Sequence, residues 1–168
     1  CLQKKIRGII NCSVNKKNLF KNRNLGVTEF LAKKNKVLNS EVMIIYNKNL
    51  SVVPLTTHIK VKDISKSIKK NLLLKKLKTL NNYYMKYFNK SPRIGVLGLN
   101  PHNFELKKNS EELKVIIPII RNLRKKIKIS GPYPADTIFL KHNRKNYDVV
   151  VGMYHDQVLT PLKTLYEY

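Results

Sequence analysis

The chain is poor in several residue types that mark particular classes of protein. It contains no tryptophan, two cysteines and ten acidic residues among 168. Cys1 and Cys12 do not have the spacing of a metal-binding pair, and two thiols form no disulfide framework, so a reducing cytoplasm is expected. The apolar runs are far too short to cross a bilayer. These scarcities argue against a disulfide-rich secreted domain and against a membrane protein.

Because acidic residues are so few, the 34 lysines and arginines leave a formal net charge of +24. Such a charge is typical of proteins that bind nucleic acids through their phosphates. The lysines are nevertheless spread along nearly every segment, and a genome rich in A/T codons explains them equally well. The chain has no aromatic RNA-binding motif, zinc-finger spacing or arginine-rich arm. We therefore expect no nucleic-acid partner, and keep a basic nucleic-acid-binding protein as an alternative.

The length and apolar content suit one ordinary folded domain. Apolar residues make up 42% of the chain, which is adequate for a core. The chain starts with Cys1 in place of a methionine and stops at Tyr168, soon after the apparent start of a helix. We expect residues 1–168 to be an internal fragment of a longer chain, incomplete at both ends.

Short apolar runs alternate with helical patterns along the sequence. Strands are predicted at residues 6–14, 93–99, 127–130 and 149–151, and a hairpin is predicted to join residues 42–46 to 50–55. Apolar residues three and four apart predict one long helix over residues 63–88, and a further helix runs from Ser110 to Lys126. Thr28 is expected to cap a short helix. This alternation predicts an α/β fold with a largely parallel sheet.

Three of the four histidines follow predicted strands. His58, His102 and His155 each stand just beyond an apolar run, whereas His142 lies in a charged segment and is expected on the surface. Ligands of open α/β sheets bind beyond the carboxyl ends of the strands. A surface or structural role explains each histidine taken singly. Three imidazoles that converge would instead form a divalent-metal site with open positions for a substrate.

Four motifs, in this order, resemble the 4-hydroxythreonine-4-phosphate dehydrogenase family of pyridoxal phosphate biosynthesis: TTH at residues 56–58, GLNPH at 98–102, GPYPADT at 131–137 and MYHDQ at 153–157. The resemblance covers nearly the whole chain. It implies a two-subdomain α/β fold related to the isocitrate and isopropylmalate dehydrogenases, with the N-terminal and C-terminal segments of the family absent here. The implied reaction is the NAD- or NADP-dependent oxidation of 4-phosphooxy-L-threonine, followed by decarboxylation to 3-amino-2-oxopropyl phosphate.

The resemblance also implies a metal site shared by two copies of the chain. His58, His102 and His155 match the ligands of a divalent metal, which is Zn, Mg or Co. In the family these ligands come from both subunits of a homodimer, so the implied active site is complete only in the dimer.

Four further residues match the family's substrate and catalytic positions. Thr28 and Lys163 are implied to bind the phosphorylated amino-acid substrate. Asp136 and Asp156 are implied to assist orientation or proton transfer. No residue of the chain can be assigned to the nicotinamide cofactor.

The chain departs from the family pattern at three places. Val27 stands where the family has a histidine, and Val158 stands where it has a glycine. Residues 103–108 replace a glycine-rich loop with bulkier side chains. These departures motivate a second hypothesis, in which the protein is a decayed, non-catalytic homologue that keeps the fold and the metal site.

Overall fold

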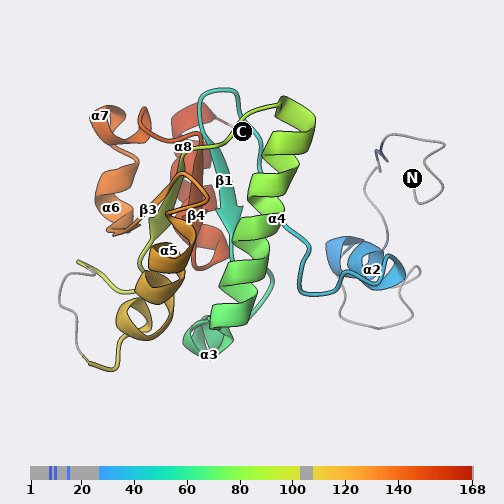
Figure 1. The fold of residues 1–168 in the computed structure, drawn as a ribbon, viewed down its shortest axis with the longest axis horizontal. Helices are drawn as coiled ribbons and strands as arrows, with labels where there is room; N and C mark the ends of the chain where they lie inside the picture. Colours follow the sequence, from blue (N-terminus) through green and yellow to red (C-terminus); the bar gives the residue numbers. More distant parts are fainter. Residues whose placement is uncertain (1–7, 9, 11–14, 16–26, 103–107, 168) are drawn as a thin grey trace. The chain divides into compact units, whose positions relative to one another are not determined.

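A computed structural model describes residues 8, 10, 15, 27–102 and 108–167. The chain divides into two compact units, residues 1–41 and 42–168, which are described separately. In the first unit, residues Val27–Lys34 form helix α2, drawn in blue in Figure 1. Thr28 is the second residue of this helix and does not precede it as a cap, because the helical backbone already begins at Val27. The strand predicted at residues 6–14 falls almost entirely outside the described residues.

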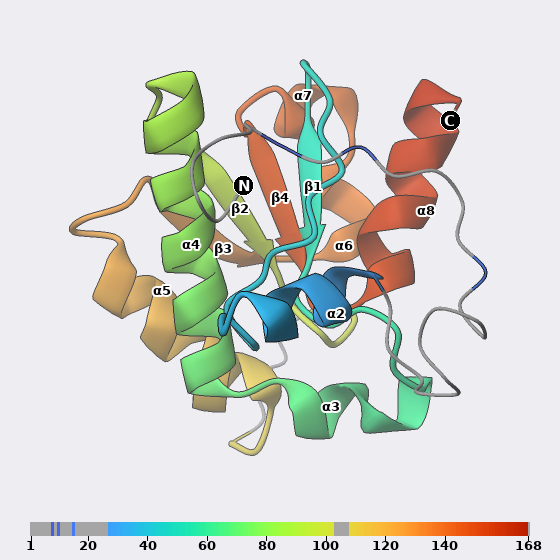
Figure 2. The ribbon, with the colours of Figure 1, turned by 90° about the vertical axis from the view of Figure 1, so that its right-hand side faces the viewer.

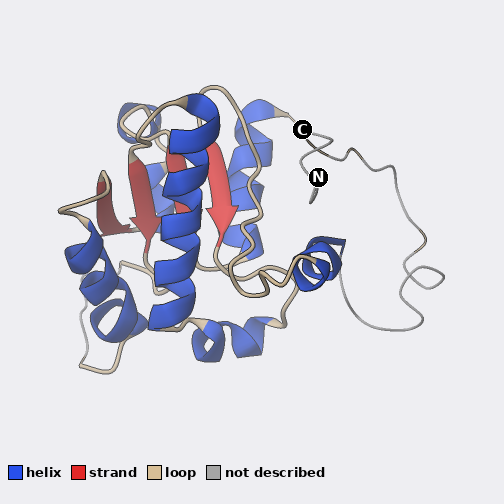
Figure 3. Ribbon diagram, turned by 45° about the vertical axis from the view of Figure 1, so that its right-hand side comes forward, coloured by secondary structure: helices blue, strands red, loops and turns tan. Residues whose placement is uncertain are grey.

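The second unit is built on a parallel sheet of four short strands. They are β1 (Ser51–Pro54), β2 (Ile94–Leu97), β3 (Ile129–Tyr133) and β4 (Val149–Gly152). Their order across the sheet is β1-β4-β2-β3, and all neighbouring pairs are parallel (Figure 3). Three of the strands are buried along their whole length, as continuous apolar runs in parallel sheets are. The predicted α/β class with a largely parallel sheet is confirmed.

Helices cover both faces of this sheet. Helices α4 (Lys70–Phe88) and α5 (Ile117–Leu123) lie on one side, and α6 (Ala135–Ile138) and α8 (His155–Tyr166) lie on the other (Figure 2). Successive strand residues point to opposite faces, so Val149 and Val151 join the core under α4 and α5 while Val150 joins the core under α8. A short helix, α7 (Lys141–Arg144), connects α6 to β4. None of the helices in the described ranges has the length and apolar character of a membrane span.

The long helix predicted at residues 63–88 is interrupted. A 3₁₀ turn (Val61–Asp63) and helix α3 (Ile64–Ser67) come first, and the backbone is then extended at Ile68 and Lys69 before α4 begins. The amide of Ile68 closes α3 by donating to the carbonyl oxygens one turn back. Its side chain is 4% exposed and packs in the core. Because Ile68 is buried together with the apolar residues of α3 and α4, the apolar spacing of three and four continues across a break in the helix. The prediction of one continuous helix was therefore wrong.

A helix is present in the range predicted from Ser110 to Lys126, but it starts as a π-helix and ends at Leu123. Residues Glu112–Ile116 form this π turn, and α5 follows directly. Pro118 has no amide hydrogen and cannot donate to the carbonyl one turn back, which accounts for the irregular hydrogen bonding on its N-terminal side.

Two strand predictions needed correction. The hairpin is reduced to one antiparallel bridge between Ile45 and Val52, and residues 42–44 form no strand. Strand β3 continues past Ser130 through Tyr133, into residues predicted to be a loop. Gly131 makes this possible: it has φ 130°, and a side chain there would collide with the backbone of Val96 on the neighbouring strand.

Candidate functional site

Three of the predicted site residues, the histidines, follow one edge of the sheet because three neighbouring strands end there. Pro54 at the end of β1 pairs with Gly152 at the end of β4, and Val96 in β2 pairs with Val151. Parallel strands in this register finish side by side. The segments that leave them carry His58, His155 and His102, in the order in which the strands lie across the sheet.

Two of the three histidines lie close together. The ring centroids of His58 and His155 are 6.0 Å apart, with an angle of 40° between the ring planes. His155 is the first residue of α8, and its Nδ1 lies 2.7 Å from Oδ1 of the exposed Asp156. His102, with φ 53°, follows the same edge of the sheet. Within the described part of a single chain, no three His, Cys, Asp or Glu side chains are grouped so that they could hold a metal ion.

The donor set of this pair fits a divalent transition metal. Imidazole nitrogen is a common zinc ligand, at about 2.0–2.1 Å, and the two rings have their centroids 6.0 Å apart. A histidine that binds a metal usually directs its second nitrogen to a carboxylate, which fixes the ring. Asp156 stands in that position on Nδ1 of His155 and leaves Nε2 for an ion. Two imidazoles alone do not complete such a site, because zinc takes at least three protein ligands.

The other predicted residues of the second unit are exposed to solvent. Asp136 lies in the first turn of α6, at the end of β3. Lys163 lies in α8, about two helical turns after His155. Both side chains are accessible to a ligand, and the structure provides no test of the roles predicted for them.

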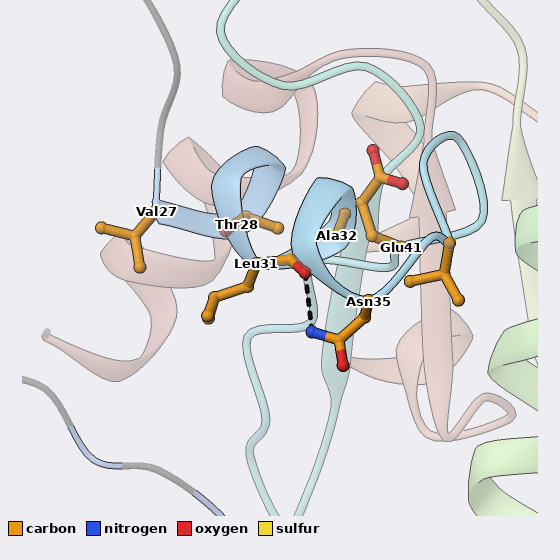
Figure 4. Close-up of a pocket in the computed structure, with 7 residues that line it drawn as sticks. Val27, Thr28, Leu31, Ala32, Asn35 and Glu41 are labelled. Carbon is orange, nitrogen blue, oxygen red and sulfur yellow. Dashed lines mark hydrogen bonds between the residues drawn. The ribbon is translucent and has the colours of Figure 1, made fainter. Parts of the chain in front are cut away.

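Thr28 lies in the first unit, where it helps to line an open pocket of about 400 Å³ (Figure 4). The wall of the pocket is mostly apolar. Along it, the side-chain amide of Asn35 donates a 2.7 Å hydrogen bond to the carbonyl oxygen of Leu31. Val27, at the position where the resemblance implies a histidine, adds another apolar side chain to this wall. The lining residues are Val27, Thr28, Leu31, Ala32, Asn35, Val37 and Glu41.

Sequence reasoning missed the side chains that fasten the strand ends to one another. Thr56 joins the end of β1 to the end of β4, because its Oγ1 donates a 2.7 Å hydrogen bond to the carbonyl of Met153. Gln157 joins β4 to β2: its Oε1 accepts from the amide of Met153 at 2.7 Å, and its Nε2 donates to the carbonyl of Gly98 at 2.8 Å. Both residues belong to the motifs TTH and MYHDQ, which were the available signal.

Glu112 was missed as well. It lies at the start of the π turn and is 1% exposed. Its Oε1 accepts from the amides of Leu99 and Asn100 at 2.8 and 2.9 Å, and its Oε2 accepts from the side-chain amide of Asn100 at 2.9 Å. Nothing in the local sequence separates this buried carboxylate from that of Glu111, which is only half-buried.

The side chain of Val158, one of the departures from the family pattern, packs in the core. Val158 is fully buried between α8 and the sheet, and a side chain at Gly152 would collide with its Cγ1. The missing side chain at position 152 thus makes room for Val158. Most of the altered loop, residues 103–107, lies outside the described residues.

Comparisons with known proteins agree with this architecture. Residues 1–167 match the family described as pyridoxal phosphate biosynthetic protein PdxA. The 4-hydroxythreonine-4-phosphate dehydrogenase of Aquifex aeolicus is 42% identical over 142 residues, which are 83% of this chain and 43% of that protein. The protein of the same name from Hydrogenobaculum sp. is 40% identical over 170 residues, or 98% of this chain and 52% of that protein.

A solved structure gives the same result. The crystal structure of 4-hydroxythreonine-4-phosphate dehydrogenase from Klebsiella pneumoniae superposes with a TM-score of 0.79 at 32% identity, and covers 90% of this chain and 47% of that one. The chain spans about half the length of the relatives it matches. It belongs to the PdxA family of pyridoxal phosphate biosynthetic proteins.

Proposed function

We propose that the protein oxidises 4-phosphooxy-L-threonine at its secondary alcohol with NAD or NADP, and that decarboxylation then gives 3-amino-2-oxopropyl phosphate for pyridoxal 5′-phosphate biosynthesis. Membership of the PdxA family and the names of its relatives support this proposal. The structural observation that carries it is the pair His58 and His155 at the carboxyl edge of the sheet, with Asp156 on one ring. This is where ligands of parallel sheets bind.

His58, His102 and His155 hold a divalent metal in this proposal. When bound there, the ion acts as a Lewis acid that polarises the substrate's hydroxyl group and lowers its pKa. A single described chain groups two of these imidazoles but no third ligand with them. We propose that a homodimer completes the site, with one histidine contributed by a second copy of the chain.

The remaining residues bind and orient the substrate. The ammonium group of Lys163 suits the phosphate, and the hydroxyl of Thr28 suits a polar substrate group. The carboxylate of Asp156 holds the ring of His155 through Nδ1. Asp136 is an exposed carboxylate at a strand end, suited to orienting the substrate or accepting a proton. The oxidation requires NAD or NADP as hydride acceptor, and no described residue is assigned to it.

Turnover by the intact protein, with the sequence that flanks this chain, tests the proposal. Purified protein supplied with a divalent metal and 4-phosphooxy-L-threonine should reduce NAD or NADP, which is followed by nicotinamide absorbance. Reduction should be lost with the unphosphorylated amino acid, because Lys163 then has no phosphate to bind. No reduction by a normally folded dimer that holds metal would instead support the decayed homologue, in which Val27 has removed a substrate contact.

A further inference from the structure

One peptide group beside the candidate metal site is held from both of its ends. The carbonyl oxygen of Gly98 accepts a 2.8 Å hydrogen bond from Nε2 of Gln157. The amide of the next residue, Leu99, donates a 2.8 Å hydrogen bond to Oε1 of Glu112. The two side chains come from different elements, since Gln157 lies in α8 and Glu112 in the π turn before α5. We call this arrangement, formed by Glu112 and Gln157 on the Gly98–Leu99 peptide, the peptide clamp.

On one side, the peptide clamp connects to His155. Gln157 lies in the first turn of α8, which begins at His155. The Oε1 of Gln157 also accepts a 2.7 Å hydrogen bond from the amide of Met153, at the end of β4. The side chain of Gln157 thus connects the segment that carries His155 to the end of β2 through hydrogen bonds. Because both ends of its amide are used, Gln157 fits in one orientation only.

On the other side, the peptide clamp connects to His102. Beyond Leu99, Glu112 also binds the backbone amide and the side-chain amide of Asn100. Pro101 follows with a fixed φ and leads directly to His102. A carboxylate that is 1% exposed is costly to leave without these partners, so the segment before His102 is strongly bound to Glu112.

We infer that Glu112 and Gln157 are positioning residues that set the place of His102 relative to His155. The inference rests on the proposed function, in which both histidines are ligands of a divalent metal. Side chains that hydrogen-bond directly to metal ligands typically change metal affinity 10- to 100-fold when they are removed. Glu112 and Gln157 act through the backbone beside the histidines, so we expect a loss at the lower end of that range. A residue that served stability alone would change the melting temperature and leave metal affinity unaltered.

Isosteric variants test the peptide clamp in the intact protein. Glu112→Gln turns one acceptor into a donor that faces the side-chain amide of Asn100, and Gln157→Glu turns the donor to Gly98 into an acceptor. Each variant should weaken Co²⁺ binding, measured by titration of its visible absorption, by roughly 10-fold, the lower end of the range for partners of metal ligands. In the metal-free protein, the NMR signals of the His102 imidazole should shift or broaden, while those of the exposed His142 should not.

Two controls separate positioning from stability. Leu80→Ala creates a cavity under α4, far along the sequence from the peptide clamp, and should lower the melting temperature without changing Co²⁺ affinity. In a His102→Ala background, Glu112→Gln should have no further effect on Co²⁺ affinity. If Leu80→Ala weakens binding as much as the clamp variants, or if Glu112→Gln acts equally without His102, the inference is overturned. If wild-type protein binds no Co²⁺, or if His102→Ala leaves binding unchanged, the proposed metal site itself fails and the inference fails with it.

Discussion

His58 and His155 lie with their ring centroids 6.0 Å apart, although His58 follows β1, the first strand along the chain, and His155 follows β4, the last. If they share a metal with His102, replacing any of the three by alanine should strip the metal from the dialysed protein, because three ligands leave little redundancy. Elemental analysis of each variant measures the loss. His142→Ala removes an exposed histidine from α7 and should keep the metal. Full retention in all three variants would disprove the assignment.

A shared site predicts complementation between inactive variants. His102→Ala and His155→Ala should each abolish metal-dependent turnover alone. If His58 and His155 come from one copy and His102 from the other, a mixed dimer of the two variants contains one site with all three histidines and one site with a single histidine.

Mixing and refolding the two variants should therefore restore about one quarter of wild-type activity, since about half of the dimers are mixed and each has one of its two sites intact. Refolding each variant by itself is the control. If all three ligands belonged to one chain, every mixed site would lack a histidine and mixing would restore nothing.

The ion pairs of Asp148 predict how stability depends on pH. Burial raises the pKa of Asp148, but hydrogen bonds from the side chain and amide of Arg93, and from Lys90, outweigh it and lower the pKa from 3.8 to about 2. The carboxylate accepts from the Arg93 amide at 2.8 Å and from Lys90 Nζ at 2.9 Å. Because the folded pKa is depressed, this stabilisation is complete well above pH 3.8 and is lost as the pH falls towards 2.

Asp148→Asn should therefore lower the free energy of unfolding at neutral pH by roughly 1–2 kcal/mol, a figure discounted because Arg93 and Lys90 are half exposed. It should also flatten the decline of stability in acid, measured by urea unfolding at a series of pH values. Glu167→Gln, at the exposed end of α8, is the control and should leave the acid dependence as it is. An unchanged acid slope in Asp148→Asn would contradict the assignment.

The contact between Gly152 and Val158 predicts coupled effects on stability. Gly152→Ala should lower the free energy of unfolding by about 1–3 kcal/mol, because the new methyl group overlaps the side chain of Val158. Val158→Ala leaves a cavity in a fully buried position and should also destabilise the fold.

The double variant Gly152→Ala/Val158→Ala should cost less than the sum of the two single variants, by roughly 0.5–3 kcal/mol, because each change relieves the other. Chemical unfolding of the four proteins measures this coupling. Gly152→Ala combined with Leu80→Ala, on the opposite face of the sheet, should be additive. Additivity in the first pair would show that Val158 does not need the space at position 152.

The sequence predicted the approximate positions of the four sheet strands, and that histidines follow three of them, because those signals are local. Continuous apolar runs such as 149–151 indicate buried parallel strands. A histidine that directly follows such a run therefore lies at the end of the strand. The break at Ile68 and Lys69 gave no such signal, because the apolar spacing is the same on both sides of it.

Contacts between distant residues could not be predicted in this way. Gln157 binds a carbonyl 59 residues earlier in the chain, and Glu112 binds an amide 13 residues earlier. Their partners are decided by how α8 and α5 pack on the sheet. The same holds for Val158, whose fit depends on the missing side chain at Gly152.

The position of β4 between β1 and β2 has a consequence for synthesis of the protein. In the described sheet, β1 reaches the other strands only through β4, whose first residue, Val149, follows almost the whole of the unit along the chain. While the ribosome is still making residues 55–148, the edges of β1 and β2 have no partner between them, and such open edges promote aggregation. His58 and His155 therefore come together only after β4 has been made and has paired with β1.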